Sequence, residues 1–277
     1  MATIRLPGLI DAHVHLREPG GEQKEDMASG TAAALAGGVT MVLDMPNTQP
    51  PITGARALAV KYGAARDKAR CDIGFFLGAT AGNAAEAASL TGQAVGLKIY
   101  FDATYGPLRI YDPAAPAGQS LAAALAHFRA WPAHRPIAVH AEGLSAAMAI
   151  GLARCFGRRL HLCHVSLATE LALVRAAKAS GVEVTCEVAP HLLVLTEKDA
   201  RRLGPYGAMR PPLAGAADVA ALWANLDAVD CLATDHAPHS RAEKEGPAPP
   251  PGVPGLETML PLLLTAVSAG RLSLDRL

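Results

Sequence analysis

The chain has few aromatic residues, no excess of charge of either sign and no long apolar run. Phe, Trp and Tyr make up 4% of its 277 residues while 51% are hydrophobic, so a packed core must be mainly aliphatic. Lys plus Arg and Asp plus Glu both number 25, which excludes the global basic field that nucleic acid or an acidic membrane surface would need. No apolar run approaches the roughly 18 residues of a membrane-spanning helix, and the first residues lack the apolar segment of a signal peptide. We therefore expect a cytoplasmic protein with neither nucleic-acid nor membrane partners.

Cysteine is also sparse, and its spacing contains no C-x-x-C pair. Reduced thiols in the core are the ordinary interpretation of such a pattern. Cys163 precedes His164 and Cys186 precedes Glu187, so both thiols stay open as metal ligands. The five cysteines are Cys71, Cys155, Cys163, Cys186 and Cys231.

Short apolar runs alternate with alanine-rich segments along the chain, and this alternation predicts the fold. Parallel strands buried on both faces have this appearance, and eight strand and helix units predict a closed (β/α)₈ barrel formed by residues 1–277 as a single domain. We expect strands near residues 9–15, 39–45, 71–78, 95–101, 136–141, 159–165, 183–188 and 230–235. We expect helices in segments such as 24–37, 54–69, 168–180 and 216–228.

Two histidines at the end of the first apolar run suggest a metal site. His13 and His15 are two residues apart, so both side chains lie on the same face of a strand, where two imidazoles can form half of a zinc site. A pair of histidines satisfied in the core or at the surface is the competing interpretation. However, His140, His164 and Asp235 also stand where apolar runs stop, and in a barrel those ends meet on one face.

Lys98 stands in the middle of the apolar segment 95–101, where a charged side chain is unusual. Burial lowers the pKa of a lysine and frees its amine. A lysine that reaches the surface or pairs with a carboxylate would be the ordinary alternative. Among metal ligands, a neutral amine could instead add carbon dioxide, and the two oxygens of the resulting carbamate could bridge two metal ions.

With these motifs in place, the chain resembles the dihydroorotases of the cyclic amidohydrolase superfamily, most closely the dihydroorotase region of animal CAD-type multifunctional pyrimidine enzymes. The resemblance runs nearly from end to end. It is carried by residues 6–19 (LPGLIDAHVHLREP), 45–48 (MPNT), 96–100 (GLKIY), 139–142 (VHAE), 163–165 (CHV), 186–191 (CEVAPH), 209–212 (MRPP) and 234–239 (TDHAPH).

The resemblance implies a zinc-dependent enzyme of pyrimidine biosynthesis that interconverts N-carbamoyl-L-aspartate and L-dihydroorotate. It implies that His13, His15, Asp235 and a carbamylated Lys98 hold one zinc, while Lys98, His140 and His164 hold a second. A third zinc would lie near Cys163 and Glu187. Asp235 would act first as general base and then as general acid.

The same resemblance assigns the substrate side of the site. Arg17, Asn47, Arg210 and His239 match positions that hold the carboxylate and ring of the substrate, and Thr104 and Tyr105 match a loop that covers it. A guanidinium can bind a carboxylate through two parallel hydrogen bonds. The implied partners are a second copy of the chain and, within a longer polypeptide, carbamoyl-phosphate synthetase and aspartate transcarbamylase.

Relatives continue beyond the position of Leu277 with segments of a small β-domain. We therefore expect a barrel that is shorter at its C-terminus than those of the family, with the accessory β-domain largely absent. Other cyclic amidohydrolases, namely dihydropyrimidinase, hydantoinase and allantoinase, would share the metal ligands and are the alternative enzymes. An inactive scaffold fragment is the non-enzymatic alternative.

Overall fold

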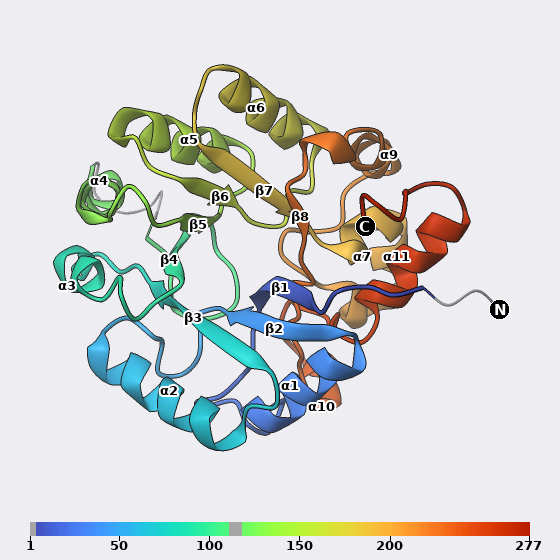
Figure 1. The fold of residues 1–277 in the computed structure, drawn as a ribbon, viewed down its shortest axis with the longest axis horizontal. Coiled ribbons are helices and arrows are strands. Elements are labelled where there is room, and N and C mark those ends of the chain that lie inside the picture. The colour runs from blue at the N-terminus through green and yellow to red at the C-terminus, as the bar shows by residue number, and fades with distance from the viewer. Residues whose placement is uncertain (1–3, 111–117) are drawn as a thin grey trace.

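The computed structural model describes residues 4–110 and 118–277, and its centre is a barrel of parallel strands. The strands pair in the order of the sequence, each with the next, and helices surround them in Figure 1. This arrangement confirms the predicted (β/α)₈ fold. The strands are β1 (Leu9–Val14), β2 (Val39–Asp44), β3 (Asp72–Gly78), β4 (Gly96–Tyr100), β5 (Ile137–His140), β6 (Leu160–Leu162), β7 (Val184–Val188) and β8 (Cys231–Leu232).

The first and last strands meet just beyond the end of β8. Val14 forms a parallel bridge with His236, and the backbone N–H of His15 donates to the carbonyl of His236 at 2.7 Å. Since β8 has only two residues, these contacts hold β1 beside the segment that follows it. The barrel therefore brings residues near positions 13 and 235 side by side.

The helices form the outer layer of the barrel, and the four segments predicted as helices are helical. Two predictions were too long, because the helix expected at 24–37 begins only at Met27 and the segment 216–228 ends its α-helix at Ala224, followed by a separate 3₁₀ turn. No helix within the described ranges is long and apolar enough to cross a membrane. The helices are α1 (Met27–Ala36), α2 (Ala55–Lys68), α3 (Ala84–Ser89), α4 (Gln119–Ala130), α5 (Leu144–Phe156), α6 (Ala168–Ala179), α7 (Pro190–Val194), α8 (Glu197–Leu203), α9 (Ala216–Ala224), α10 (Arg241–Lys244) and α11 (Met259–Ser268), with 3₁₀ turns η1 (Gly204–Gly207) and η2 (Leu226–Ala228).

The alternation of side chains along each strand separates the packed core from the barrel interior. On β4, Leu97 and Ile99 belong to the apolar core, while Lys98 and Tyr100 line a cavity inside the barrel. The same rule places Val139 of β5 in the core. Because successive side chains point to opposite faces, the strands that supply the aliphatic core also supply polar groups to the interior.

The cysteines are reduced, but not all of them lie in the core. Cys155 on α5 is exposed, so the prediction of a core thiol was wrong at this position, which lies on the outer face of a surface helix. Cys186 is buried in the apolar core. Cys163 is also buried, but it belongs to a small separate cluster with Phe76 and Ala138.

Candidate active site

The backbone turns at two of the predicted ligands. His164 and Asp235 have φ angles of 36° and 49°, and they are the non-glycine residues with left-handed φ in the described part of the chain. On a regular strand Cys163 and His164 would lie on opposite faces, yet here both side chains contact interior groups. Such conformations typically cost about 1–3 kcal/mol and tend to occur at functional sites.

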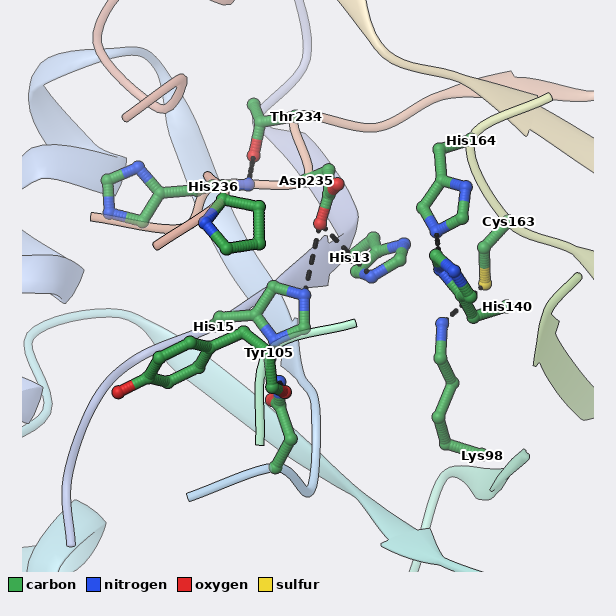
Figure 2. A network of polar contacts seen from close by, with 12 residues as sticks. His13, His15, Lys98, Tyr105, His140, Cys163, His164, Thr234, Asp235 and His236 are labelled. Carbon is green, nitrogen blue, oxygen red and sulfur yellow. Dashed lines mark hydrogen bonds and ion pairs between the residues drawn. The ribbon is translucent and has the colours of Figure 1, made fainter. Parts of the chain in front are cut away.

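His13, His15 and Asp235 form one compact group at the end of β1. The carboxylate Oδ1 of Asp235 lies 3.0 Å from Nε2 of His15 and 3.3 Å from Nε2 of His13. The two imidazole rings are 5.1 Å apart between centroids, and both are buried. Figure 2 shows all three side chains converging on one point. Two histidines and one carboxylate are a common zinc ligand set.

The second nitrogen of each of these histidines is also held. Nδ1 of His13 pairs with Oε1 of Glu187, and Nδ1 of His15 lies 2.6 Å from Oδ1 of Asn47. These contacts fix the orientation of each ring and leave Nε2 directed at Asp235. Such outer partners commonly orient metal-binding histidines.

His140 and His164 form a second group across the barrel. Nδ1 of His140 lies 2.9 Å from Nε2 of His164, and the ring centroids are 4.6 Å apart. Within the described residues, the buried atoms His140 Nε2 and His164 Nδ1 make no hydrogen bond, although Glu142 Oε1 lies 3.2 Å from His140 Nε2. Buried polar atoms without partners are uncommon in proteins. The nitrogens that face each other, Nδ1 of His140 and Nε2 of His164, are the ones that could bind a common cation.

Lys98 ends beside Cys163 and His140. Its side chain is fully buried, and its Nζ donates to Sγ of Cys163 at 2.8 Å. The same Nζ is 5.3 Å from the centroid of the Tyr100 ring. Figure 2 shows the amine end of Lys98 directed toward Cys163 and His140. Lys98 thus lies inside the barrel, and its bridge to two metals stays a prediction.

The charges around these residues favour a cation. Burial raises the pKa of Asp235, but the neighbouring His13 and His15 outweigh burial and hold the pKa well below its usual range. Burial lowers the pKa of His15 to about 4 and that of His164 well below its usual value. Burial and Lys98 also lower the pKa of His13, but Glu187 and Asp235 raise it to about 10. The ionised Asp235 and the neutral His15 and His164 are thus in the state in which these side chains bind metals, whereas His13 would have to release a proton to a metal ion.

Three sets of donor atoms within the described residues could each hold a metal ion, with all atoms of a set within 4.8 Å of one another. In the third set, however, both nitrogens of His161 already have partners, Thr185 Oγ1 at 2.8 Å and Glu187 Oε2 at 3.0 Å. His161 and Glu187 of that set are therefore already hydrogen-bonded to each other and do not need a metal ion. The sets are His13 with His15 and Asp235, His13 with Cys163 and Glu187, and His161 with Glu187 and Cys231.

Three of the predicted substrate residues, Arg17, Asn47 and Arg210, line the same cavity as the metal-ligand candidates, whereas His239 does not line it. Arg17 is buried, donates from Nε to the carbonyl of Pro238 at 2.9 Å and places Nη2 3.1 Å from Nε2 of His239. Arg210 is exposed and reaches the cavity from its rim. The predicted residues on the cavity wall are His13, His15, Arg17, Asn47, Lys98, Thr104, Tyr105, His140, His164, Arg210 and Asp235.

Sequence reasoning missed residues that hold the backbone of the group of His13, His15 and Asp235 in place. Asp11 accepts hydrogen bonds from the backbone N–H groups of His13 and Thr234, both at 3.1 Å, and from the Thr234 hydroxyl at 2.5 Å. It thereby ties β1 to the segment that carries Asp235. The signal was present, because Asp11 is two residues before His13 and shares its strand face. His236, which pairs with Glu25 at 2.9 Å, was also missed.

The chain is similar to known proteins over nearly its whole length. Residues 4–247 match the amidohydrolase family. The chain is 54% identical to the multifunctional protein CAD of Squalus acanthias over 275 residues, which cover 99% of this chain but only 12% of that protein. It is 36% identical to a dihydroorotase of Halobacterium salinarum, covering 98% of this chain and 68% of the relative.

Solved structures share the fold. The L-hydantoinase (dihydropyrimidinase) of Arthrobacter aurescens superposes with a TM-score of 0.87 and 29% identity, covering 98% of this chain and 68% of that one. The inactive dihydroorotase-like domain of a Chaetomium thermophilum CAD-like multifunctional protein gives 0.82 and 29% identity, covering 100% and 77%. The fold is therefore shared by an enzyme and by an inactive relative, so the side chains of the site must decide the function.

Proposed function

This chain belongs to the amidohydrolase family, and from that premise we propose that it is a zinc-dependent dihydroorotase of pyrimidine biosynthesis. The observation that carries the proposal is the shared cavity, in which Arg17 lies beside the group of His13, His15 and Asp235. A metal site can hydrolyse a cyclic amide, and a guanidinium can bind a carboxylate. Together they suit a substrate that is a cyclic amide with a carboxylate group. L-Dihydroorotate is such a compound.

The residues present fit the metal that this chemistry needs. We propose that His13, His15 and Asp235 hold one zinc, that His140 and His164 hold a second, and that Lys98 joins the two sites once it is carbamylated. The approach of His140 Nδ1 to His164 Nε2, at 2.9 Å, supports this assignment. Cys163 and Glu187, which approach His13 from the other side, would hold a third ion.

Zinc, when bound, makes water a nucleophile at neutral pH and polarises the carbonyl that is attacked. Asp235 then has the task of moving a proton. Its carboxylate is ionised because its pKa is held low, and its Oδ1 lies 3.0 Å from His15 Nε2. We propose that it accepts the proton of the attacking water and delivers it to the ring nitrogen that leaves.

Arg17, Asn47, Arg210 and His239 are proposed to orient the substrate. The Arg17 guanidinium retains N–H groups that face the cavity, and Asn47 is fixed because its Oδ1 contacts His15 and its Nδ2 donates to the carbonyl of Tyr105 at 3.1 Å. Thr104 and Tyr105 form the wall through which a ligand would enter. These residues place the ring so that its amide faces Asp235.

A hydantoinase or dihydropyrimidinase activity is the second candidate, and the similarity to the Arthrobacter aurescens enzyme favours it. Those rings lack a carboxylate, so they would leave Arg17 buried without an anionic partner. An inactive chain is the third candidate. Every predicted zinc ligand is retained, which argues against it.

One assay separates the three candidates. Zinc-loaded protein is mixed in turn with L-dihydroorotate, hydantoin and dihydrouracil under the same conditions, and ring opening is followed by absorbance. Turnover of L-dihydroorotate alone supports the proposal, faster turnover of a neutral ring supports the second candidate, and no turnover supports the third. Elemental analysis of protein purified without chelator should give two or three zinc ions per chain, and fewer than about one would contradict the proposed centre.

We further propose that the barrel works as one domain of a longer polypeptide that contains carbamoyl-phosphate synthetase and aspartate transcarbamylase. The high identity to a multifunctional CAD protein, of which this chain spans 12%, supports this. A homo-oligomeric state and a cytoplasmic location stay predictions. Size-exclusion chromatography with light scattering tests the first.

A further inference from the structure

Tyr105 separates two cavities at the open end of the barrel. The inner one, lined by the metal-ligand candidates, has a volume of about 20 Å³, which is room for about one water molecule. The outer one has about 320 Å³ and is lined by Lys24 and Glu243. Arg17, Asn47 and Tyr105 line both. A six-membered ring is larger than the inner cavity as it stands, and movement of Tyr105, which lines both cavities, would join them.

Lys24 is the residue that holds the Tyr105 side chain in this position. Its Nζ donates to the Tyr105 hydroxyl at 2.7 Å and lies 4.6 Å from the centroid of the ring. Figure 2 shows that this hydroxyl points away from His13 and His15. The contact therefore fastens the ring at its outer end, while the ring itself covers the metal-ligand side.

Lys24 is in turn held by the helix after the last strand. Its side chain is 5% exposed, and its Nζ lies 2.7 Å from Oε1 of Glu243 on α10. Burial raises the pKa of Glu243, but hydrogen bonds from Lys24 and Ser240 lower it to about 2, so the carboxylate is charged. A buried lysine with an ionised partner has few alternative positions. Tyr105 is thereby tied to the rigid part of the barrel.

Lys24 also determines which nitrogen of His239 carries the proton. Its Nζ is 3.4 Å from Nδ1 of His239, and an ammonium can only donate, so Nδ1 must accept. The proton then lies on Nε2, which is 3.0 Å from the carbonyl of Pro251 and 3.1 Å from Nη2 of Arg17. That single N–H donates to the Pro251 carbonyl, so Nε2 cannot accept from Arg17 Nη2, and the N–H groups of Nη2 stay available to another acceptor.

We propose that Lys24 is a positioning residue for substrate binding, which holds Tyr105 closed over the ligand and fixes the tautomer of His239. The inference rests on the proposed function for the identity of the substrate. The contact between Lys24 and Tyr105 breaks when the site opens and forms again when it closes. Lys24 itself touches no reacting atom.

The test uses Lys24→Met and Tyr105→Phe in the zinc-loaded full chain. Tyr105→Phe removes only the hydroxyl and keeps both the ring and the charge of Lys24. Each variant should raise KM and the calorimetric Kd for L-dihydroorotate roughly tenfold, the expected effect of one lost charged hydrogen bond, while kcat changes less than about twofold. The double variant should be no worse than Lys24→Met alone, because both changes remove the same contact.

Lys178→Met is the matched control. Like Lys24, Lys178 is paired with a carboxylate, that of Asp230 at 2.7 Å, but this pair lies on the outer surface. It should leave KM unchanged. A raised KM in Lys24→Met with a normal KM in Tyr105→Phe would mean that Lys24 merely attracts an anion, and would overturn the inference. Additive effects in the double variant, or unchanged KM in both single variants, would overturn it as well.

A second measurement does not depend on turnover. Chymotrypsin cleaves after both Tyr and Phe, so the rate of cleavage at position 105 reports how often this segment opens. Loss of the contact should raise that rate roughly tenfold in Lys24→Met and Tyr105→Phe relative to wild type and to Lys178→Met. Equal rates in all four proteins would overturn the inference. If the wild type shows no turnover while Lys24→Met and Tyr105→Phe are cleaved faster than the wild type, only the proposed function is refuted.

Discussion

Replacing Arg17 by Met tests the substrate assignment most directly. The Arg17 side chain is 6% exposed, and its Nε donates to the carbonyl of Pro238 at 2.9 Å, so the guanidinium is already fixed and desolvated before a ligand arrives. Met keeps much of the volume of the alkyl stem and removes the charge. Only a ligand with a carboxylate should be sensitive to this change.

The size of the effect follows from the burial of the pair. Loss of one partner of a buried, hydrogen-bonded charge pair costs about 2–5 kcal/mol, which corresponds to roughly 30-fold to a few thousand-fold in affinity. Asn47 and His239 remain in place and can still contact the ligand. We therefore expect the lower part of this range, a loss of about 30- to 300-fold for L-dihydroorotate.

The assay compares L-dihydroorotate with its neutral carboxamide by calorimetry, using zinc-loaded wild type and Arg17→Met. The carboxamide should lose less than about threefold, because it offers no charge to the guanidinium. Arg129→Met is the control, since Arg129 is an exposed arginine of α4 that stacks on Phe156, 6.0 Å from its centroid. Equal losses for the two ligands would refute the reasoning and assign Arg17 a structural role.

The other predictions concern the bridge, a buried ion pair and the pH dependence of stability. Lys98→Ala should abolish turnover of L-dihydroorotate, short carboxylic acids should restore part of it, and Lys98→Arg should not; full turnover in the Ala variant would exclude the carbamate. Lys61→Met should lower the free energy of unfolding in urea by about 3–5 kcal/mol, because it leaves Asp44, 2.6 Å away and equally buried, without its counter-charge. Adding Asp44→Asn should recover part of that loss, and no recovery would contradict the explanation. Burial lowers the pKa of His239 from 6.5 to about 3, so the unfolded chain binds this proton first, and stability should fall as pH decreases below about 6.5. His239→Gln should flatten that slope in thermal unfolding between pH 7 and 5, whereas an unchanged slope would argue against the shift.

The strands and the first metal-ligand group could be predicted from the sequence because both depend on local periodicity. An apolar run buried on both faces indicates a parallel strand, and the period of two places His13 with His15 and sets Lys98 apart from Leu97 and Ile99. The positions of His140, His164 and Asp235 at the ends of such runs were enough to predict that one barrel face would gather them. No long-range information was needed for these steps.

Local rules failed where the backbone leaves the regular strand or where a charge is buried by its surroundings. Cys163 and His164 are neighbours and should face opposite ways, but the left-handed φ at His164 turns both inward. Lys61 lies on a helix whose sequence gives no sign of burial, and only its packing over Asp44 and Phe75 accounts for it. Such contacts depend on which elements lie side by side.

The sequence by itself therefore determined the barrel and the kinds of group that its interior would carry, because side-chain alternation is a property of each strand alone. The tertiary structure decided how those groups are held. Asp11 meets Thr234, and Lys24 meets both Tyr105 and His239, across separations that no local pattern can span. Closure of the barrel between β1 and the segment after β8 brings His13 and His15 beside Asp235, and that closure is the physical reason why the complete candidate site exists only in the fold.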